Sequence, residues 1–223
     1  MMMLITTIRP CLLNIRWVLI LAAGLLAAGC GSNPGGGALT PAQEARSAVP
    51  QRQKEAVGAP PALVFIVFVR TPQDVADRML KMAHVTKDDV VCDLGCGDGL
   101  ILVTAAKRYG CRAIGYDLDP LRVEEARENA ERQGVSHLVT VEKKDVLSVD
   151  LKGVSVVTLY MGTEINARLI PQLSRLAPGA RIVSHDFPIA DIPPDKAEIM
   201  TSREDHRRHR VLLWRCPLQK NAK

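Results

Sequence analysis

The stretch Val90–Gly99, with the sequence VVCDLGCGDG, constrains the fold of this chain more than any other. Its first half is a short apolar run, which is typical of a strand buried in a parallel sheet. Its second half places glycine at alternate positions, Gly95, Gly97 and Gly99, and an apolar helical pattern begins at Leu100. Glycine at this spacing allows a sharp turn and close approach of a ligand, and a helix N-terminus offers unpaired N–H groups. The stretch therefore predicts a strand, a ligand-binding turn and a helix.

Two common glycine-rich motifs do not fit this turn. A dinucleotide fingerprint requires Gly or Ala where Leu100 stands, and Asp98 places a negative charge where a pyrophosphate would bind. A P-loop requires a lysine after its last glycine, and none follows. The remaining pattern, hydrophobic-Asp-x-Gly-x-Gly-x-Gly, resembles motif I of class I S-adenosylmethionine (SAM) methyltransferases, with Asp93 as its acidic residue. SAM carries no phosphate, and its cationic amino group and sulfonium suit such a carboxylate.

The rest of the chain alternates strand and helix patterns, which predicts a parallel sheet. Thr71 is expected to cap a helix that begins at Pro72. The basic run 203–210 is expected to form a solvated hairpin turn, the alternative being a docking site for acidic protein or lipid headgroups. The predicted fold is α/β, a Rossmann-like class I methyltransferase sheet that is mostly parallel with an antiparallel C-terminal hairpin strand. Strands are expected over 90–94, 112–116, 138–141, 154–159, 181–184, 197–201 and 211–214, and further helices over 100–108, 121–133, 164–169 and around 173–176.

Acidic residues at two further strand ends complete the predicted SAM site. Asp117 lies 18 residues after Gly99, where a carboxylate can accept both ribose hydroxyls of an adenosine. The alternative is a turn or helix-capping role for Asp117. Leu118 begins a turn that resembles the family's D-x-D-P turn, and Asp145 stands where the family places an acidic residue facing the adenine amino group. The resemblance implies SAM as cofactor and no metal. The implied cofactor-binding residues are Thr71, Asp93, Gly95, Gly97, Gly99, Asp117, Leu118 and Asp145.

Three further stretches narrow the resemblance. They are residues 69–75 (VRTPQDV), 156–160 (VVTLY) and 181–187 (RIVSHDF). Together they resemble a small prokaryotic methyltransferase family, similar to the mitochondrial protein-lysine methyltransferases that act on the c-subunit of ATP synthase and related targets. The resemblance covers residues 63–216 and implies methyl transfer from SAM to a protein lysine. Phe68 and Arg70 depart from the Tyr and Pro expected of the family at these positions.

A lysine methyltransferase needs no catalytic triad, because the substrate amine is the nucleophile. The enzyme must align that amine and keep it neutral. Tyr160, at the end of the fourth strand, is the first catalytic candidate, and His185 and Asp186 at the end of the fifth are the next. The alternatives are a core-rim aromatic, a structural histidine and a loop cap. No Asn-Pro-Pro-Tyr stands at the fourth strand end, which argues against a nucleic-acid substrate.

Two other functions stay open from the sequence: a small-molecule methyltransferase, and an exported, membrane-tethered binding module that keeps the fold without catalysis. The second depends on residues 1–30, where Arg9 and Arg16 precede an uncharged run, Trp17–Ala28, that is short for the ~20 residues of a spanning helix. This segment resembles a bacterial lipoprotein signal with Cys30 as the lipidated residue. An uncleaved anchor and a misassigned start are the alternatives.

The chain is therefore expected to be membrane-associated through residues 1–30. The side of the membrane stays open, because a lipoprotein signal would place the domain where SAM is not made. The net charge of +5 favours acidic partners or a membrane surface only mildly, and no nucleic-acid partner is expected. The predicted organisation is a signal or anchor (1–30), a flexible linker (31–61), the methyltransferase domain (62–217) and a short tail (218–223).

Overall fold

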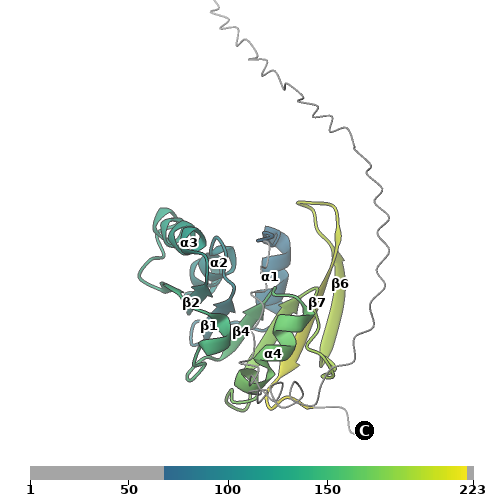
Figure 1. Cartoon of the computed structure of the whole chain (residues 1–223). Helices are drawn as coiled ribbons and strands as arrows, with labels where there is room; N and C mark the ends of the chain where they lie inside the picture. The colour runs from purple at the N-terminus through teal and green to yellow at the C-terminus, as the bar shows by residue number, and fades with distance from the viewer. Residues whose placement is uncertain (1–67, 220–223) are drawn as a thin grey trace, which may run out of the picture. The chain divides into compact units, whose positions relative to one another are not determined.

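The computed structural model describes residues 68–219 (Figure 1). The predicted signal or anchor, the linker, the first residues of the domain and the last four of the tail therefore lie outside the described residues. Within 68–219, no helix combines the length and the apolar character needed to cross a membrane.

A seven-stranded sheet with the order β3-β2-β1-β4-β5-β7-β6 forms the centre of the domain. The five strands from β1 to β5 are parallel, β7 runs antiparallel to β5, and β6 runs antiparallel to β7. This confirms the predicted mostly parallel sheet with its antiparallel hairpin. The strands are β1 (Val90–Leu94), β2 (Arg112–Asp117), β3 (Val139–Lys143), β4 (Val156–Leu159), β5 (Arg181–His185), β6 (Lys196–Thr201) and β7 (Arg208–Arg215).

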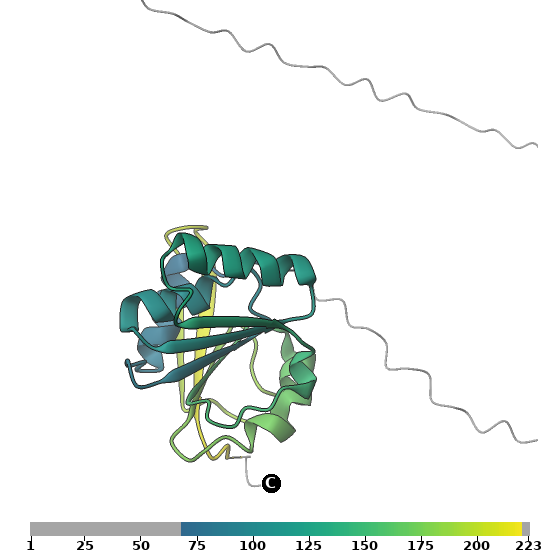
Figure 2. The same ribbon diagram turned by 90° about the vertical axis from the view of Figure 1, so that its left-hand side faces the viewer.

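Helices cover both faces of the sheet, as Figure 2 shows. Three of them, α1 (Gln73–Met82), α2 (Leu100–Tyr109) and α3 (Pro120–Arg132), pack on one face, and α4 (Thr163–Leu173) packs on the other. Strand β1 is buried on both sides because its side chains alternate: Val91 joins the core under α1 and α2, whereas Leu94 joins the core under α4.

The connections leave a crevice at one end of the sheet. From β1 the chain moves outward to β2 and β3, and it then returns to place β4 and β5 on the other side of β1. The strand order therefore reverses between β1 and β4. At such a reversal the helices on either side diverge, and ligands bind beyond the carboxyl ends of the strands.

Two local predictions about helices are corrected. Thr71 does not cap α1, because Pro72 holds the cap position without a side-chain bond and the Thr71 hydroxyl lies 3.3 Å from a ring nitrogen of His185. The first helix expected after β4 extends to Leu173 as α4 and contains Pro171 near its end, whereas residues 174–176, expected to be helical, form a turn.

The basic run 203–210 forms the predicted solvated turn, since residues 203–208 and Arg210 are exposed. Its residue His209 is buried, and the preceding turn packs on the N-terminus of α1. The Glu204 carboxylate accepts a hydrogen bond from the backbone N–H of Gln73 at 2.6 Å, and the Asp74 carboxylate accepts one from the Ser202 hydroxyl at 2.8 Å. Carboxylates at a helix N-terminus satisfy its free N–H groups and complement its dipole. The hairpin is therefore fixed to α1.

Candidate active site

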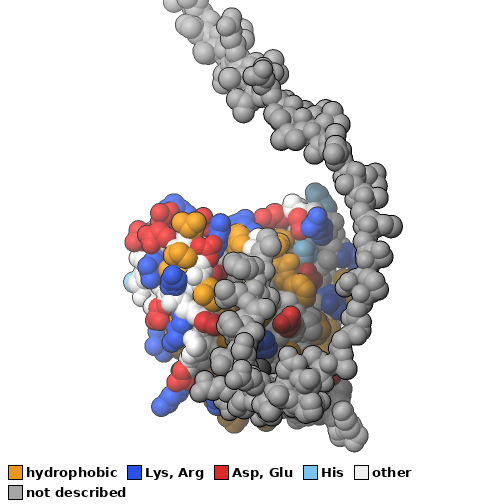
Figure 3. All heavy atoms as spheres, viewed as in Figure 1, with side chains coloured by type: hydrophobic (Ala, Val, Ile, Leu, Met, Phe, Trp, Pro, Cys, Tyr) orange, Lys and Arg blue, Asp and Glu red, His pale blue; other side chains and the backbone are white. Residues whose placement is uncertain are grey.

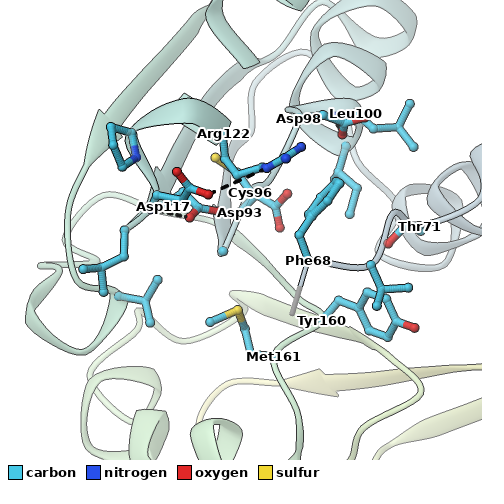
Figure 4. A pocket seen from close by; sticks show the side chains of 17 residues that line it. Phe68, Thr71, Asp93, Cys96, Asp98, Leu100, Asp117, Arg122, Tyr160 and Met161 are labelled. Carbon is cyan, nitrogen blue, oxygen red and sulfur yellow. Dashed lines mark hydrogen bonds and ion pairs between the residues drawn. The ribbon is translucent and has the colours of Figure 1, made fainter. Parts of the chain in front are cut away.

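A cavity of about 480 Å³ lies beyond the carboxyl ends of β1, β2 and β4, at the crevice between β1 and β4 (Figure 4). This volume falls within the range of small-molecule and cofactor sites. Five of the eight predicted cofactor-binding residues line it: Thr71, Asp93, Gly95, Asp117 and Leu118.

Asp93 forms a buried acidic wall of the cavity. It lies on β1 opposite Thr158 of β4, whose hydroxyl donates a hydrogen bond of 2.5 Å to the carboxylate. Burial, together with the nearby carboxylates of Asp117 and Asp98, raises the pKa of Asp93 to about 7, although the hydrogen bond from Thr158 lowers it. A cation in the cavity would oppose this shift, since it favours the charged carboxylate.

Asp117 is held in place at the end of β2 by two backbone groups. One carboxylate oxygen accepts a hydrogen bond of 2.9 Å from the N–H of Gly97, and the other accepts one of 3.0 Å from the N–H of Asp119. Each oxygen of a carboxylate can accept more than one hydrogen bond. Asp117 thus presents a fixed acceptor pair at the cavity, as the ribose role requires.

The three glycines of the turn all have positive φ, but they have different neighbours. A Cβ atom on Gly95 would lie 2.0 Å from the sulfur of Met161, and one on Gly97 would lie 2.2 Å from the Phe68 ring. Gly95 therefore keeps a cavity wall free of side chain, whereas Gly97 does not line the cavity and leaves room for the Phe68 ring that does. A Cβ atom on Gly99 would instead lie 2.8 Å from the Cβ of Ala126 in α3. Gly99 is therefore a packing residue between helices and does not line the cavity.

Asp145 lies apart from the cavity wall. Its carboxylate accepts a hydrogen bond of 2.9 Å from the N–H of Leu147 and caps the short 3₁₀ helix Val146–Ser148. The side chain of Val146 lines the cavity in its place. Leu118 does line the cavity and is 55% exposed, so it belongs to the rim.

Of the three catalytic candidates, only Tyr160 reaches the cavity. Its ring stacks on the buried ring of His185, with 3.8 Å between the ring centroids. His185 therefore lies behind Tyr160. Asp186 follows in a turn with φ of 59°, and its carboxylate accepts a hydrogen bond of 2.7 Å from the N–H of Arg210. Burial and the negative charge of Asp186 raise the pKa of the Tyr160 phenol.

Several cavity residues were not predicted from the sequence. Phe68 and Arg122 form one wall together, with the guanidinium carbon 4.5 Å from the ring centroid. Asp98 lines the cavity and pairs with Arg70 at 2.8 Å. Met161 follows Tyr160 at the end of β4 and faces Gly95. The position of Met161 at a strand end could have indicated that it lines the cavity. The position of Arg122 within a helix carries no such signal.

The residues present fit a cationic nucleoside. Four aspartates, Asp93, Asp98, Asp117 and Asp119, line the cavity. One arginine also lines it, Arg122, which stacks on Phe68 and lies 3.9 Å from Asp119. Such a wall favours a ligand with positive charge and hydroxyl groups and disfavours a phosphate. This agrees with SAM as the predicted cofactor.

Known proteins with similar sequences and structures are methyltransferases. Residues 93–196 match the family described as the ANTKMT methyltransferase domain. The chain is 38% identical over 151 residues to a protein-lysine N-methyltransferase of Saccharolobus islandicus, and the match covers 67% of this chain and 92% of that protein. It is 39% identical over 104 residues to the adenine nucleotide translocase lysine N-methyltransferase of Mus musculus, where the match spans 46% of this chain and only 45% of the relative.

A solved structure with similar sequence and fold comes from Salinibacter ruber. It is described as an RNA methyltransferase in complex with S-adenosyl-L-homocysteine, the product that SAM leaves after methyl transfer. The identity is 38%, the TM-score is 0.63, and the match covers 70% of this chain and 98% of that chain. A TrmN structure from Thermus thermophilus, 21% identical with a TM-score of 0.53 over 66% of this chain and 48% of that one, shares the fold.

Proposed function

Since this chain belongs to the class I SAM-dependent methyltransferase family that includes the protein-lysine N-methyltransferase of Saccharolobus islandicus, we propose that it transfers a methyl group from SAM to the side-chain amine of a protein lysine. The observation that carries the lysine assignment is the extent of that similarity, which covers 92% of the Saccharolobus enzyme. The small-molecule and binding-module alternatives are not favoured, because two relatives that the match covers over more than nine-tenths of their length are named for protein-lysine and RNA methylation.

Different residues of the cavity would have different roles in this reaction. SAM, when bound, supplies an electrophilic methyl group on its sulfonium. Asp93 and Asp98 place negative charge where the cationic part of the cofactor would lie, and Asp117 offers its two oxygens to the ribose. Tyr160 lines the part of the cavity nearest to β5, where it would orient the incoming amine.

The charges around α3 are mixed and not uniformly basic. A nucleic-acid site needs a basic patch or stripe, and Figure 3 shows acidic and basic side chains interspersed around α3. The arginines of this helix pair with its own glutamates, as Arg122 does with Glu125 and Arg132 with Glu128. No continuous basic stripe runs along α3.

The acceptor is tested by following the methyl group. Purified protein is incubated with radiolabelled SAM and a lysate, and samples are then digested with protease or with ribonuclease. We expect label that protease removes from macromolecules and that mass spectrometry locates on lysine. Label that ribonuclease removes, or label confined to small molecules, would contradict the lysine acceptor and leave the methyltransferase assignment in place. An Asp117→Ala sample controls for label that does not depend on the SAM site.

We further propose that the protein is attached to a membrane through residues 1–30. The support is the uncharged run Trp17–Ala28 between Arg16 and Cys30. Attachment would place the catalytic domain near membrane proteins, and a relative named for the adenine nucleotide translocase makes a membrane-protein acceptor a reasonable first choice. Membrane fractionation tests this proposal separately from the activity.

A further inference from the structure

Four side chains connect the cavity wall to the surface hairpin. The Thr71 hydroxyl oxygen, which lines the cavity, lies 3.3 Å from Nδ1 of His185. Nε2 of His185 lies 2.8 Å from Nδ1 of His209, and Nε2 of His209 lies 3.1 Å from the exposed carboxylate of Asp205. Both histidines are buried. This series of contacts joins the segment before α1 to β5, β7 and the turn between β6 and β7.

The carboxylate at the surface end of this series of side chains, that of Asp205, determines the direction of the hydrogen bonds along the series. The Asp205 carboxylate is only an acceptor, and hydrogen bonds from the Arg207 N–H and from His209 lower its pKa. Nε2 of His209 must therefore carry the hydrogen. With Nδ1 of His209 as the acceptor of the 2.8 Å contact, His185 donates from Nε2. The tautomers are assigned from this network.

The surroundings of the histidines support the same tautomers. One carboxylate oxygen of Asp186 lies 3.4 Å from Nε2 of His185 and 3.6 Å from Nδ1 of His209, so a carboxylate lies beside the hydrogen that the two rings share. Burial lowers the pKa of His185, against the raising effects of the Asp186 and Asp205 carboxylates, so that the imidazole is neutral. The remaining face of the ring is covered by Tyr160. Nδ1 of His185 therefore carries no hydrogen, and its lone pair is directed at the Thr71 hydroxyl.

We infer that His185, His209 and Asp205 are positioning residues that force the Thr71 hydroxyl to donate away from the cavity, so that its oxygen accepts a hydrogen bond from the substrate amine. The inference rests on the proposed function. It assigns Thr71 to the substrate amine, whereas the sequence predicted that Thr71 binds the cofactor. A neutral amine must keep its nitrogen lone pair free for the methyl carbon. A hydroxyl that donated a hydrogen bond to the amine would occupy that lone pair. A hydroxyl that accepts a hydrogen bond from an N–H of the amine leaves the lone pair free for the methyl carbon.

The same histidines and Asp186 offer three atoms within 4.8 Å that could hold a metal ion. The 2.8 Å between the two nitrogens is a hydrogen-bond distance. Two ligands of a tetrahedral zinc ion would lie ~3.3 Å apart, given zinc–nitrogen distances of about 2.0–2.1 Å. The separation therefore favours a hydrogen-bonded pair.

The tautomers are tested by ¹⁵N–¹H correlation spectra of histidine rings in the full chain, assigned with His185→Gln and His209→Gln variants. We expect His185 and His209 both to be protonated at Nε2 and free at Nδ1. Protonation of His185 at Nδ1 would overturn the inference, and so would ring shifts that change on addition of EDTA and return with Zn²⁺. Neither result depends on which acceptor the enzyme methylates.

The role of Thr71 is tested by kinetics on a lysine peptide identified in the labelling experiment. Thr71→Val, which keeps the shape and removes the hydroxyl, should lower kcat/KM by about 10- to 100-fold with SAM affinity and thermal stability nearly unchanged. Thr71→Ser, which restores the hydroxyl, should recover most of the activity. His209→Gln should give an intermediate loss that varies with pH differently from the wild type.

Two outcomes separate this inference from the proposed function. A wild-type enzyme that methylates lysine and is unaffected by Thr71→Val would contradict the inference alone. Loss of SAM binding in the same variant would return Thr71 to the cofactor and also overturn it. Failure of the wild type to methylate any lysine would count against the proposed function. The ring spectra would still determine the direction of the hydrogen bonds from Thr71 to Asp205.

Discussion

At the scale of the residue, the site depends on carboxyl groups whose charge responds to the ligand. Asp93 is the clearest case, because burial raises its pKa to about 7 before any cation is present. A bound cation favours the ionised form, so binding must release a proton wherever the carboxyl is protonated. Below its pKa, affinity for SAM should therefore fall as the pH falls.

Isothermal titration with SAM between about pH 5.5 and 8 measures this linkage. For one released proton we expect the dissociation constant to approach a tenfold rise per pH unit below about pH 7 and to level off above it. Asp93→Asn should bind more weakly and lose this pH dependence. A wild-type affinity that is flat across the range would contradict the role given to Asp93.

Asp117 is expected to contribute directly to cofactor affinity. Asp117→Ala removes the acceptor pair and frees the N–H of Gly97, so SAM binding should weaken by about 1.5–3 kcal/mol, the scale of hydrogen bonds to a charged group. Titration of Glu128→Ala, a change on the surface of α3, provides the control and should match the wild type. Equal affinity in Asp117→Ala would assign this residue to the turn alone.

Tyr160 is expected to affect turnover more than binding. Its ring lines the cavity and stacks on His185, so Tyr160→Phe keeps the stack and removes only the hydroxyl. We expect kcat to fall by about tenfold with little change in SAM affinity, since an aligned hydrogen bond contributes on the order of 1 kcal/mol. A variant with wild-type turnover would leave Tyr160 as an aromatic wall of the cavity.

At the scale of the element, the glycine turn joins ligand binding to helix packing. Gly99 and Gly110 both have positive φ at the ends of α2, but only Gly99 faces another helix. Gly110→Ala meets no atom within 4 Å, so it should cost only the backbone strain of about 1–2 kcal/mol. Gly99→Ala should lower the free energy of unfolding by about 1–3 kcal/mol more, because its Cβ overpacks Ala126.

Urea unfolding of both variants measures the difference. Each has the same change of residue and a similar φ, so the comparison isolates the packing of α2 on α3. If the two variants lost equal stability, Gly99 would have no packing role, and a loss of SAM binding in Gly99→Ala would then point to the cofactor.

The sequence predicted the elements better than the contacts between them. Alternation of strand and helix patterns and the glycine turn were sufficient for the sheet and for Asp93 and Asp117 at its edge. Periodicity could not indicate that the charged turn before β7 would pack on α1, because charged residues at 203–208 are typical of solvated turns. The burial of His209 and the cavity position of Arg122 depend on tertiary packing, which no local pattern encodes.

At the scale of the whole molecule, the attachment of the domain is the feature to test. If Cys30 is lipidated, Cys30→Ala should release the protein from the membrane fraction or leave it as an unprocessed precursor. Membrane fractionation with intact-mass measurement distinguishes the outcomes. Unchanged mass and unchanged membrane association in the variant would indicate a retained hydrophobic anchor instead.

The position of Phe68 has a mechanical consequence. The 67 residues that precede it join the domain at a side chain that is itself a wall of the cavity, and Arg122 stacks on that side chain from α3. A displacement of Phe68 would thus move a wall of the cavity without passing through the sheet.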